Sequence, residues 1–557
     1  MASVQQQVTS ASDVISHNIS QLADNRGFLS QNVLSQLRNL LEALAVWVHT
    51  GDASTQMHYN KVGPAFDALA GKVKYRLLSR FHGLLQASAS HYTLDGDPSE
   101  RLMLKYYEFL MRTRDVAQKE LGVKILANLE NFPVDQDPSL REYREAIAEC
   151  VDRANAGLAE PARTDRYYVH SSRPFFVRGR IYYEVTFSVA HDRASKFDRT
   201  IAFTDIDLTD KYAARLSLGN DQISVLGRTM PIVLIRSWEV SIRPCEFSNF
   251  AYLFGASKKA QSTHAEYRNL MTYLTRTQSN LLDLMDMPDA RYAQIRTWCL
   301  SRSRSDSVIF AALDQARGII RRNAGGARLL RYLLLRMSNS VIRSQYSSDR
   351  CFRLSNLHAS WGSIPFDTMP FCTSPRLHNP RFVDLAESIP IAGRQHELLA
   401  RRVKNAVEDG GSIYMPVAEL EDLGDVDALI EKHNSLLYSN AKQQRRKLVH
   451  DKHHVFIEGY EEDAVEIITQ LQSIAAFGEP SYTLTVDSWL RANPTAVDDP
   501  LKTEALRVLF ETSNVALVYG AAGTGKSTMI DHIARLFAGE RKLLLAHTNP
   551  AVDNLRR

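Results

Sequence analysis

The first part of the chain has the hydrophobic spacing of helices. Over residues 32–49 the apolar positions recur at intervals of three and four, which places them on one helical face. Residues 102–123 and 143–154 repeat this period. Turn-forming residues at 51–52 and 95–98 separate the stretches. We therefore predict a mostly helical region over residues 1–160.

The pattern then changes to short runs of β-branched and aromatic residues. Residues 175–177 and 181–189 flank the Arg-Gly-Arg sequence at 178–180, which predicts two strands around a tight turn. Further runs of this kind occur at 201–203, 223–226 and 232–235. We predict a β-rich middle domain over residues 161–258, in which no motif indicates a particular chemistry.

Helical spacing returns in a strongly basic region, residues 259–350. Between positions 301 and 350 there are ten Arg and three Asp and neither Lys nor Glu, a net charge of +7. Two helices are predicted, over 308–322 and 327–342, with a glycine-containing loop between them. One interpretation is a hairpin that contacts nucleic-acid phosphates through Arg321, Arg322 and Arg328. The other is an amphipathic helix pair whose arginines are solvated or ion-paired elsewhere.

The remaining regions are shorter and more mixed. Residues 351–410 are rich in proline and read as an irregular segment followed by a helix, and a basic loop is expected over 442–452. The whole chain is predicted to be a multidomain α+β protein. Its predicted parts are 1–160 helical, 161–258 β-rich, 259–350 basic and helical, 351–410 irregular with a helix, 411–485 small α/β, and 486–557 the start of a P-loop α/β domain.

Composition excludes several classes of protein. The 557 residues are 44% hydrophobic and 23% charged, as in ordinary globular proteins, and the net charge of +4 is too small to indicate nucleic acid by itself. The five cysteines are far apart and form no CxxC pair, which argues against a disulfide framework or a zinc ribbon and favours the reducing cytoplasm. There is neither a signal-peptide pattern nor an apolar run of 18 residues, so no membrane association is expected.

The strongest chemical motif lies near the C-terminal end. An apolar run at 515–519, which we predict to be a buried parallel strand, leads into Gly520-Ala-Ala-Gly-Thr-Gly-Lys-Ser527, which fits the phosphate-loop pattern GxxxxGK[ST]. A helical apolar pattern and a second buried-strand pattern at 543–546 follow. The glycines allow the backbone to wrap around a phosphate, Lys526 would contact the β- and γ-phosphates, and Ser527 would hold Mg²⁺. The predicted residues for ATP and Mg²⁺ are Gly520, Gly523, Thr524, Gly525, Lys526, Ser527 and Thr528.

The same region resembles a known family. The Gly-Thr-Gly-Lys core, followed by Thr548-Asn549-Pro-Ala-Val-Asp-Asn-Leu555, is similar to motifs I and Ia of superfamily 1 helicases, and its Asn-x-Ala-Val-Asp-x-Leu part is closest to the branch that contains the nonsense-mediated-decay RNA helicase. The resemblance implies a RecA-like motor domain and an ATP-dependent helicase activity. It also implies that Thr548 and Asn549 contact the backbone of single-stranded DNA or RNA.

The sequence departs from this family in two respects. The region 499–506, where such helicases carry an adenine-reading Gln, contains none. The sequence also ends at Arg557, shortly after motif Ia and before the acidic and arginine-containing motifs that hydrolyse ATP. We therefore expect the N-terminal part of a longer helicase, with no catalytic residue inside these 557 positions and no hydrolysis by this part alone.

Two other functions stay open. The phosphate loop could serve a nucleotide-sensing, nucleic-acid-binding switch without motor activity. Alternatively, residues 1–500 could form a scaffold that binds protein partners. Among weaker constellations, a metal site at His450, His453 and His454 is less expected than a solvated basic loop.

A nucleophile pair and a second metal cluster are also less expected than structural roles for the same residues. A Cys372 nucleophile with His378 or His396 is less expected than loop packing. A metal cluster of Asp205, Asp207 and Asp210 lacks the rest of a nuclease pattern. Trp238, Trp361 and Trp489 are expected in cores or interfaces.

Overall fold

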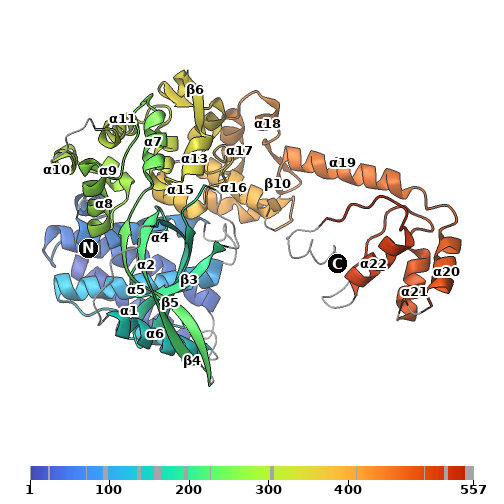
Figure 1. The fold of residues 1–557 in the computed structure, drawn as a ribbon. Helices are drawn as coiled ribbons and strands as arrows, with labels where there is room; N and C mark the ends of the chain where they lie inside the picture. Colours follow the sequence, from blue (N-terminus) through green and yellow to red (C-terminus); the bar gives the residue numbers. More distant parts are fainter. Residues whose placement is uncertain are drawn as a thin grey trace. The chain divides into compact units, whose positions relative to one another are not determined.

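The computed structural model of the chain describes all residues except 1, 23–25, 71, 92–97, 134–139, 156–164, 193–197, 226, 302–306, 409, 495, 498, 520–524 and 546–557. These residues form two compact units (Figure 1). Unit 1 comprises residues 1–444 and 448–455, and unit 2 comprises residues 445–447 and 456–557. The protein is thus a mixture of helices and sheets in more than one unit, as the sequence predicted at that level.

Unit 1 begins with a helical layer whose core is made by the predicted apolar faces. Its elements are α1 (Val4–Leu22), α2 (Arg26–Thr50), α3 (Val62–Ala70), α4 (Arg76–His91) and α5 (Pro98–Leu121). Leu37, Leu40, Leu41 and Leu44 of α2 are completely buried in one core with Phe81 of α4. The helices predicted over 32–49 and 102–123 are therefore confirmed.

A closed five-stranded barrel follows. Its strands are β1 (Tyr167–Val177), β2 (Arg180–Val189), β3 (Thr200–Thr204), β4 (Ala214–Val225) and β5 (Arg228–Val240), in the order β1-β2-β3-β5-β4. The two-residue turn at Arg178 and Gly179 has left-handed φ values of 49° and 73°, which suit a tight hairpin. Single residue pairs, Tyr167 with Ala214 and Phe203 with Leu234, join β1 to β4 and β3 to β5. Helix α6 (Arg141–Asn155) shares a core with the barrel through Ile147 and Val151, so the predicted helix and hairpin are both confirmed.

Short helices build the rest of unit 1. They are α7 (Pro244–Tyr252), α8 (Ala265–Thr277), α9 (Leu281–Asp286), α10 (Asp289–Leu300), α11 (Ile309–Arg321), α12 (Ala327–Leu335), α13 (Asn339–Ser344), α14 (Ile364–Thr368), α15 (Phe382–Ser388) and α16 (Gln395–Glu408). A small hairpin, β6 (Tyr346–Cys351) and β7 (Leu357–Ala359), separates α13 from α14. The segment predicted as irregular because of its prolines contains α14. Pro365 lies in the first turn of this helix, where a backbone N–H would have no partner within the helix.

A second small sheet ends this part of the chain. It has the order β8-β10-β9, with β8 (Met415–Pro416), β9 (Leu448–Asp451) and β10 (His454–Ile457), and it accompanies α17 (Val426–Ser435) and α18 (Ala441–Gln444). The prediction of a loop over 442–452 is wrong, because these residues contain the end of α18 and all of β9. The side chain of Asn434 pairs with both the N–H and the carbonyl of Leu448, at 2.9 Å each, and so fixes the start of β9.

The elements that lie wholly within the described part of unit 2 are helices, joined by irregular segments. They are α19 (Glu458–Ala475), α20 (Tyr482–Ala492), α21 (Pro500–Val508) and α22 (Lys526–Leu536). Tyr482, Val486, Leu506 and Met529 form the buried centre that joins the last three. None of the described helices of either unit combines the length and the apolar character that a bilayer crossing needs.

Candidate nucleotide and nucleic-acid sites

Helix α22 starts directly after the last glycine of the phosphate-loop motif. Gly525 is its N-cap and has a left-handed backbone with φ 83° and ψ 20°, and its carbonyl accepts the first helical hydrogen bond from the N–H of Met529 at 3.0 Å. Lys526 and Ser527 then occupy the first turn, where the free N–H groups of a helix favour an anion. The other predicted loop residues, at 520–524, lie outside the described residues.

A second lysine approaches the same point from α21. The Nζ of Lys502 lies 3.2 Å from the position that a β-carbon on Gly525 would occupy, and its Cε lies 3.3 Å from it. The left-handed backbone favours a glycine at position 525, and a β-carbon there would also push the end of the Lys502 side chain aside. The ammonium group of Lys502 therefore lies near the N-terminus of the helix whose first residue is Lys526. Sequence reasoning missed Lys502, because only the fold brings α21 against this end of α22.

Tyr482 of α20 links the helices of unit 2 through a hydrogen bond and a ring contact. The hydroxyl of Tyr482 donates to the carbonyl of Leu506 at 2.7 Å, and its ring stacks on Phe537 with centroids 6.3 Å apart. Met529 and His532 of α22 are buried on this side, whereas Ser527 and Thr528 are exposed. The helix thus buries its apolar face and leaves its hydroxyl groups accessible at the start.

The two strands predicted beside the loop are not present. Residues 515–519 and 541–545 have no strand structure, and Leu517, Tyr519, Leu543 and Leu545 are 72%, 86%, 83% and 79% exposed. A buried parallel strand needs neighbouring strands and helices on both faces, and the described part of unit 2 contains no parallel sheet for these segments to join. The prediction of buried strands over the described part of these segments is therefore wrong. Ala546, Thr548 and Asn549 lie outside the described residues.

The arginines of the basic region are largely engaged within the protein. Arg321, at the end of α11, forms an ion pair with Asp289 at 2.5 Å. Arg328 of α12 donates to the carbonyls of Asp367 and Thr368 at 3.0 and 3.2 Å. Arg322 is exposed. The predicted helix pair is present. The contacts of Arg321 and Arg328 agree with the interpretation in which the arginines are paired within the protein.

The N-terminus of α12 is already capped by a carboxylate. The side chain of Asp367, which is buried, accepts hydrogen bonds from the N–H groups of Gly326, Arg328 and Leu329 at 2.7, 3.0 and 3.0 Å. These are the groups that would otherwise receive a phosphate at this helix. The position at the N-terminus of α12 where an anion could bind is therefore occupied by the carboxylate of Asp367.

The three aspartates at 205, 207 and 210 lie among cations. Asp207 is 3.2 Å from Arg112, and Asp210 is 2.6 Å from Arg381. Although burial alone would raise the pKa of Asp210, Lys211 and Arg336 hold it below its ordinary value. Among the described residues there is no group of acidic, histidine or cysteine side chains that could hold a metal ion. His450 lies 2.8 Å from Asp427, and His454 contacts the carbonyl of Lys452.

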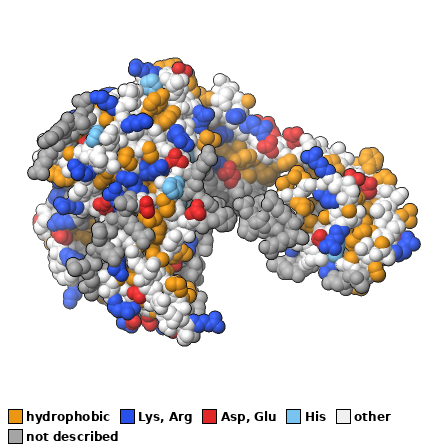
Figure 2. Space-filling view, in the orientation of Figure 1, with side chains coloured by type: hydrophobic (Ala, Val, Ile, Leu, Met, Phe, Trp, Pro, Cys, Tyr) orange, Lys and Arg blue, Asp and Glu red, His pale blue; other side chains and the backbone are white. Residues whose placement is uncertain are grey.

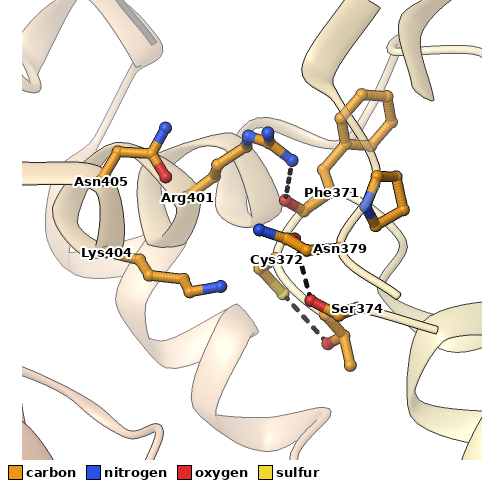
Figure 3. Close-up of a pocket in the computed structure, with 9 residues that line it drawn as sticks. Phe371, Cys372, Ser374, Asn379, Arg401, Lys404 and Asn405 are labelled. Atoms are coloured by element: carbon orange, nitrogen blue, oxygen red, sulfur yellow. Dashed lines mark hydrogen bonds between the residues drawn. The ribbon is translucent and has the colours of Figure 1, made fainter. Parts of the chain in front are cut away.

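Cys372 lines a small hollow beside α16 (Figure 3). Arg401 and Lys404 project from α16 toward it, and Arg401 donates to the carbonyl of Phe371 at 3.4 Å. Neither His378 nor His396 belongs to the lining. The Nε2 of His378 lies 2.6 Å from the hydroxyl of Tyr332, and burial together with nearby cations lowers the pKa of His396 to about 4. The hollow therefore presents a thiol next to cations and no histidine base.

The arrangement was compared with known proteins. Comparisons with protein-family models, with curated proteins and with solved structures found no match. A function for the chain is therefore proposed from its own sequence and structure.

Proposed function

We propose that this chain carries the ATP-binding part of a superfamily 1 DNA or RNA helicase with a RecA-like motor domain. In this proposal the loop at 520–527 binds ATP with Mg²⁺, and Thr548 and Asn549 contact a single strand. The five free cysteines support a reducing, cytoplasmic location.

One observation carries the proposal. Lys526 is the first residue of a helix whose N-cap, Gly525, has a left-handed backbone. A glycine turn that delivers a Lys-Ser pair to a helix N-terminus brings N–H groups, the helix dipole and an ammonium group to one position. This is the chemistry that a triphosphate requires.

The residues present fit magnesium-bound ATP. Lys526 would neutralise the terminal phosphates, and the exposed hydroxyl of Ser527 would hold the metal. Lys502 adds a second cation beside Gly525. The bound nucleotide supplies the free energy for movement along a strand, and these side chains supply its binding and orientation.

The proposal is tested by the coupling between the two ligands. The affinity of the 557-residue chain for a labelled single strand is measured with and without a non-hydrolysable ATP analogue and Mg²⁺. We expect a change of at least about fivefold, since coupled sites differ by 1–3 kcal/mol, and no change in Lys526→Ala. Lys542→Ala, at the opposite end of α22, is the matched control. An unchanged affinity in the wild-type chain contradicts the helicase proposal.

A further inference from the structure

An exposed group of aromatic side chains surrounds Arg353 in unit 1. We call this group the Arg353 platform and define it as Phe352, Arg353, Trp361 and Tyr438. Phe352 and Trp361 are 66% and 50% exposed, so of the two expected places for Trp361, a core or an interface, the core is excluded. Large aromatic side chains gain stability when a partner covers them, and a group of them on the surface indicates an interaction site.

The platform is a compact arrangement from separate segments. The rings of Phe352 and Trp361 meet edge to face, with centroids 5.3 Å apart. The guanidinium carbon of Arg353 lies 6.0 Å from each of these two centroids and 5.8 Å from that of Tyr438. The planar cation is thus the centre on which three aromatic rings converge, within the range of cation–π attraction.

Rigid backbone presents these side chains. Leu354 is completely buried next to the exposed Phe352 and Arg353. A β-carbon on Gly325 would lie 2.0 Å from the carbonyl oxygen of Arg353, so the turn packs against the backbone of the α11–α12 loop. The hydroxyl of Ser355 also donates to the carbonyl of Gly325 at 2.7 Å. Such support orders the platform before any ligand arrives, which lowers the entropic cost of binding.

The surroundings are cationic. Arg350 and Arg376 are exposed, and the guanidinium of Arg376 donates to Ser360, directly before Trp361, at 3.3 Å. Among the described residues, neither they nor Arg353 takes part in an ion pair. In the segment 343–381 the acids are Asp349 and Asp367, and Asp367 is buried as the cap of α12. At the end of unit 1 where β6 lies, Figure 2 shows cationic and hydrophobic side chains next to one another, with acidic side chains among them.

We propose that the Arg353 platform binds single-stranded nucleic acid, with bases stacked on Trp361, Phe352 and the guanidinium plane of Arg353. Arg350 and Arg376 contact the adjacent phosphates. Stacking needs open base faces, which a single strand offers and a duplex does not. The positive surroundings favour a polyanion over an apolar protein partner. This contact lies in unit 1 and does not depend on the proposed ATP site.

The test uses the full chain without nucleotide. Fluorescence anisotropy of labelled oligo(dT) and oligo(U) is measured at low and high salt, which also distinguishes DNA from RNA. We expect Trp361→Ala to weaken binding by about tenfold, the usual loss for one stacked base. Trp298→Ala is the matched control, because Trp298 of α10 is 46% exposed and has no cation–π contact with an arginine among the described residues. Arg353→Lys keeps the positive charge but removes the planar guanidinium group on which a base can stack, and it should also weaken binding.

Each outcome decides the proposal. A loss in Trp361→Ala and Arg353→Lys, but not in Trp298→Ala, supports it. Equal affinity of the wild type and Trp361→Ala, or no binding of either oligonucleotide at low salt, overturns it and leaves the platform to a protein partner. Retained Trp361-dependent binding that does not respond to the ATP analogue would overturn the helicase proposal alone.

Discussion

The ammonium group of Lys502 lies 3.2 Å from the point where a β-carbon on Gly525 would stand. Gly525 is the N-cap of α22, so the ammonium group of Lys502 lies near the positive end of this helix. A bound phosphate would interact favourably with this ammonium group and with the N–H groups that begin the helix.

Gly525→Ala should strongly weaken ATP binding. An alanine at φ 83° is strained by about 1–2 kcal/mol, and its β-carbon would displace Lys502. We expect the affinity for Mg-ATP in isothermal titration calorimetry to fall by at least about tenfold. Gly539→Ala is the matched control, because nothing lies within 4 Å of a β-carbon there. Equal losses in both variants would show that position 525 has no special role.

Lys502→Gln should reduce the affinity for ATP and ADP and leave the affinity for adenosine unchanged. Removing one cation at the edge of the site is expected to weaken ATP and ADP by about two- to fivefold. Adenosine, which carries no phosphate, serves as the control ligand in the same competition assay. A loss that is as large for adenosine would place Lys502 at the base and contradict a phosphate-directed role.

Asp367→Ala should destabilise the protein more than an exposed aspartate does. The buried carboxylate accepts three backbone N–H bonds at the start of α12, and its removal leaves these donors without a partner. We expect the free energy of unfolding to fall by about 2–3 kcal/mol in urea denaturation. The exposed Asp349→Ala should change it by less than about 0.5 kcal/mol. Similar values for both would contradict the capping role.

Glu246 should make stability depend on pH. The side chain is fully buried, and burial raises its pKa from 4.5 to about 7 despite hydrogen bonds from Tyr168 and from the N–H of Arg243. The folded state therefore holds this proton more tightly than the unfolded state. Its stabilising contribution is complete below about pH 4.5 and is lost as the pH rises to about 7.

The corresponding variant is Glu246→Gln, which cannot titrate. Between about pH 4.5 and about pH 7, the free energy of unfolding of the wild type should fall by about 3 kcal/mol relative to that of the variant. Urea denaturation at a series of pH values measures it, and other titrating groups cancel in the difference. A difference that stays constant with pH would contradict the raised pKa.

Local patterns in the sequence were sufficient for elements that depend on near neighbours. The apolar face of α2, the hairpin turn at Gly179 and the start of α22 after Gly525 were predictable from periodicity and glycine chemistry alone. The apolar runs at 515–519 and 543–545 were misread, because a strand exists only where partner strands are present.

Contacts between distant segments could not be predicted. The sequence shows a basic stretch around Arg321 and Arg328, but only the fold brings Asp289 and the carbonyl of Asp367 to them. The approach of Lys502 to Gly525 is likewise tertiary. The position of Arg353 next to Trp361 and Tyr438 is also a property of the fold, which no local pattern reveals.

The most direct test of the central claim is the binding of Mg-ATP to the 557-residue chain. Isothermal titration calorimetry should show one saturable site that requires Mg²⁺ and is lost in Lys526→Ala. Lys542→Ala should bind as the wild type does, because its ammonium contacts carbonyls at the other end of α22. Absence of binding in the wild-type chain, or equal binding in Lys526→Ala, would contradict the assignment of the phosphate loop.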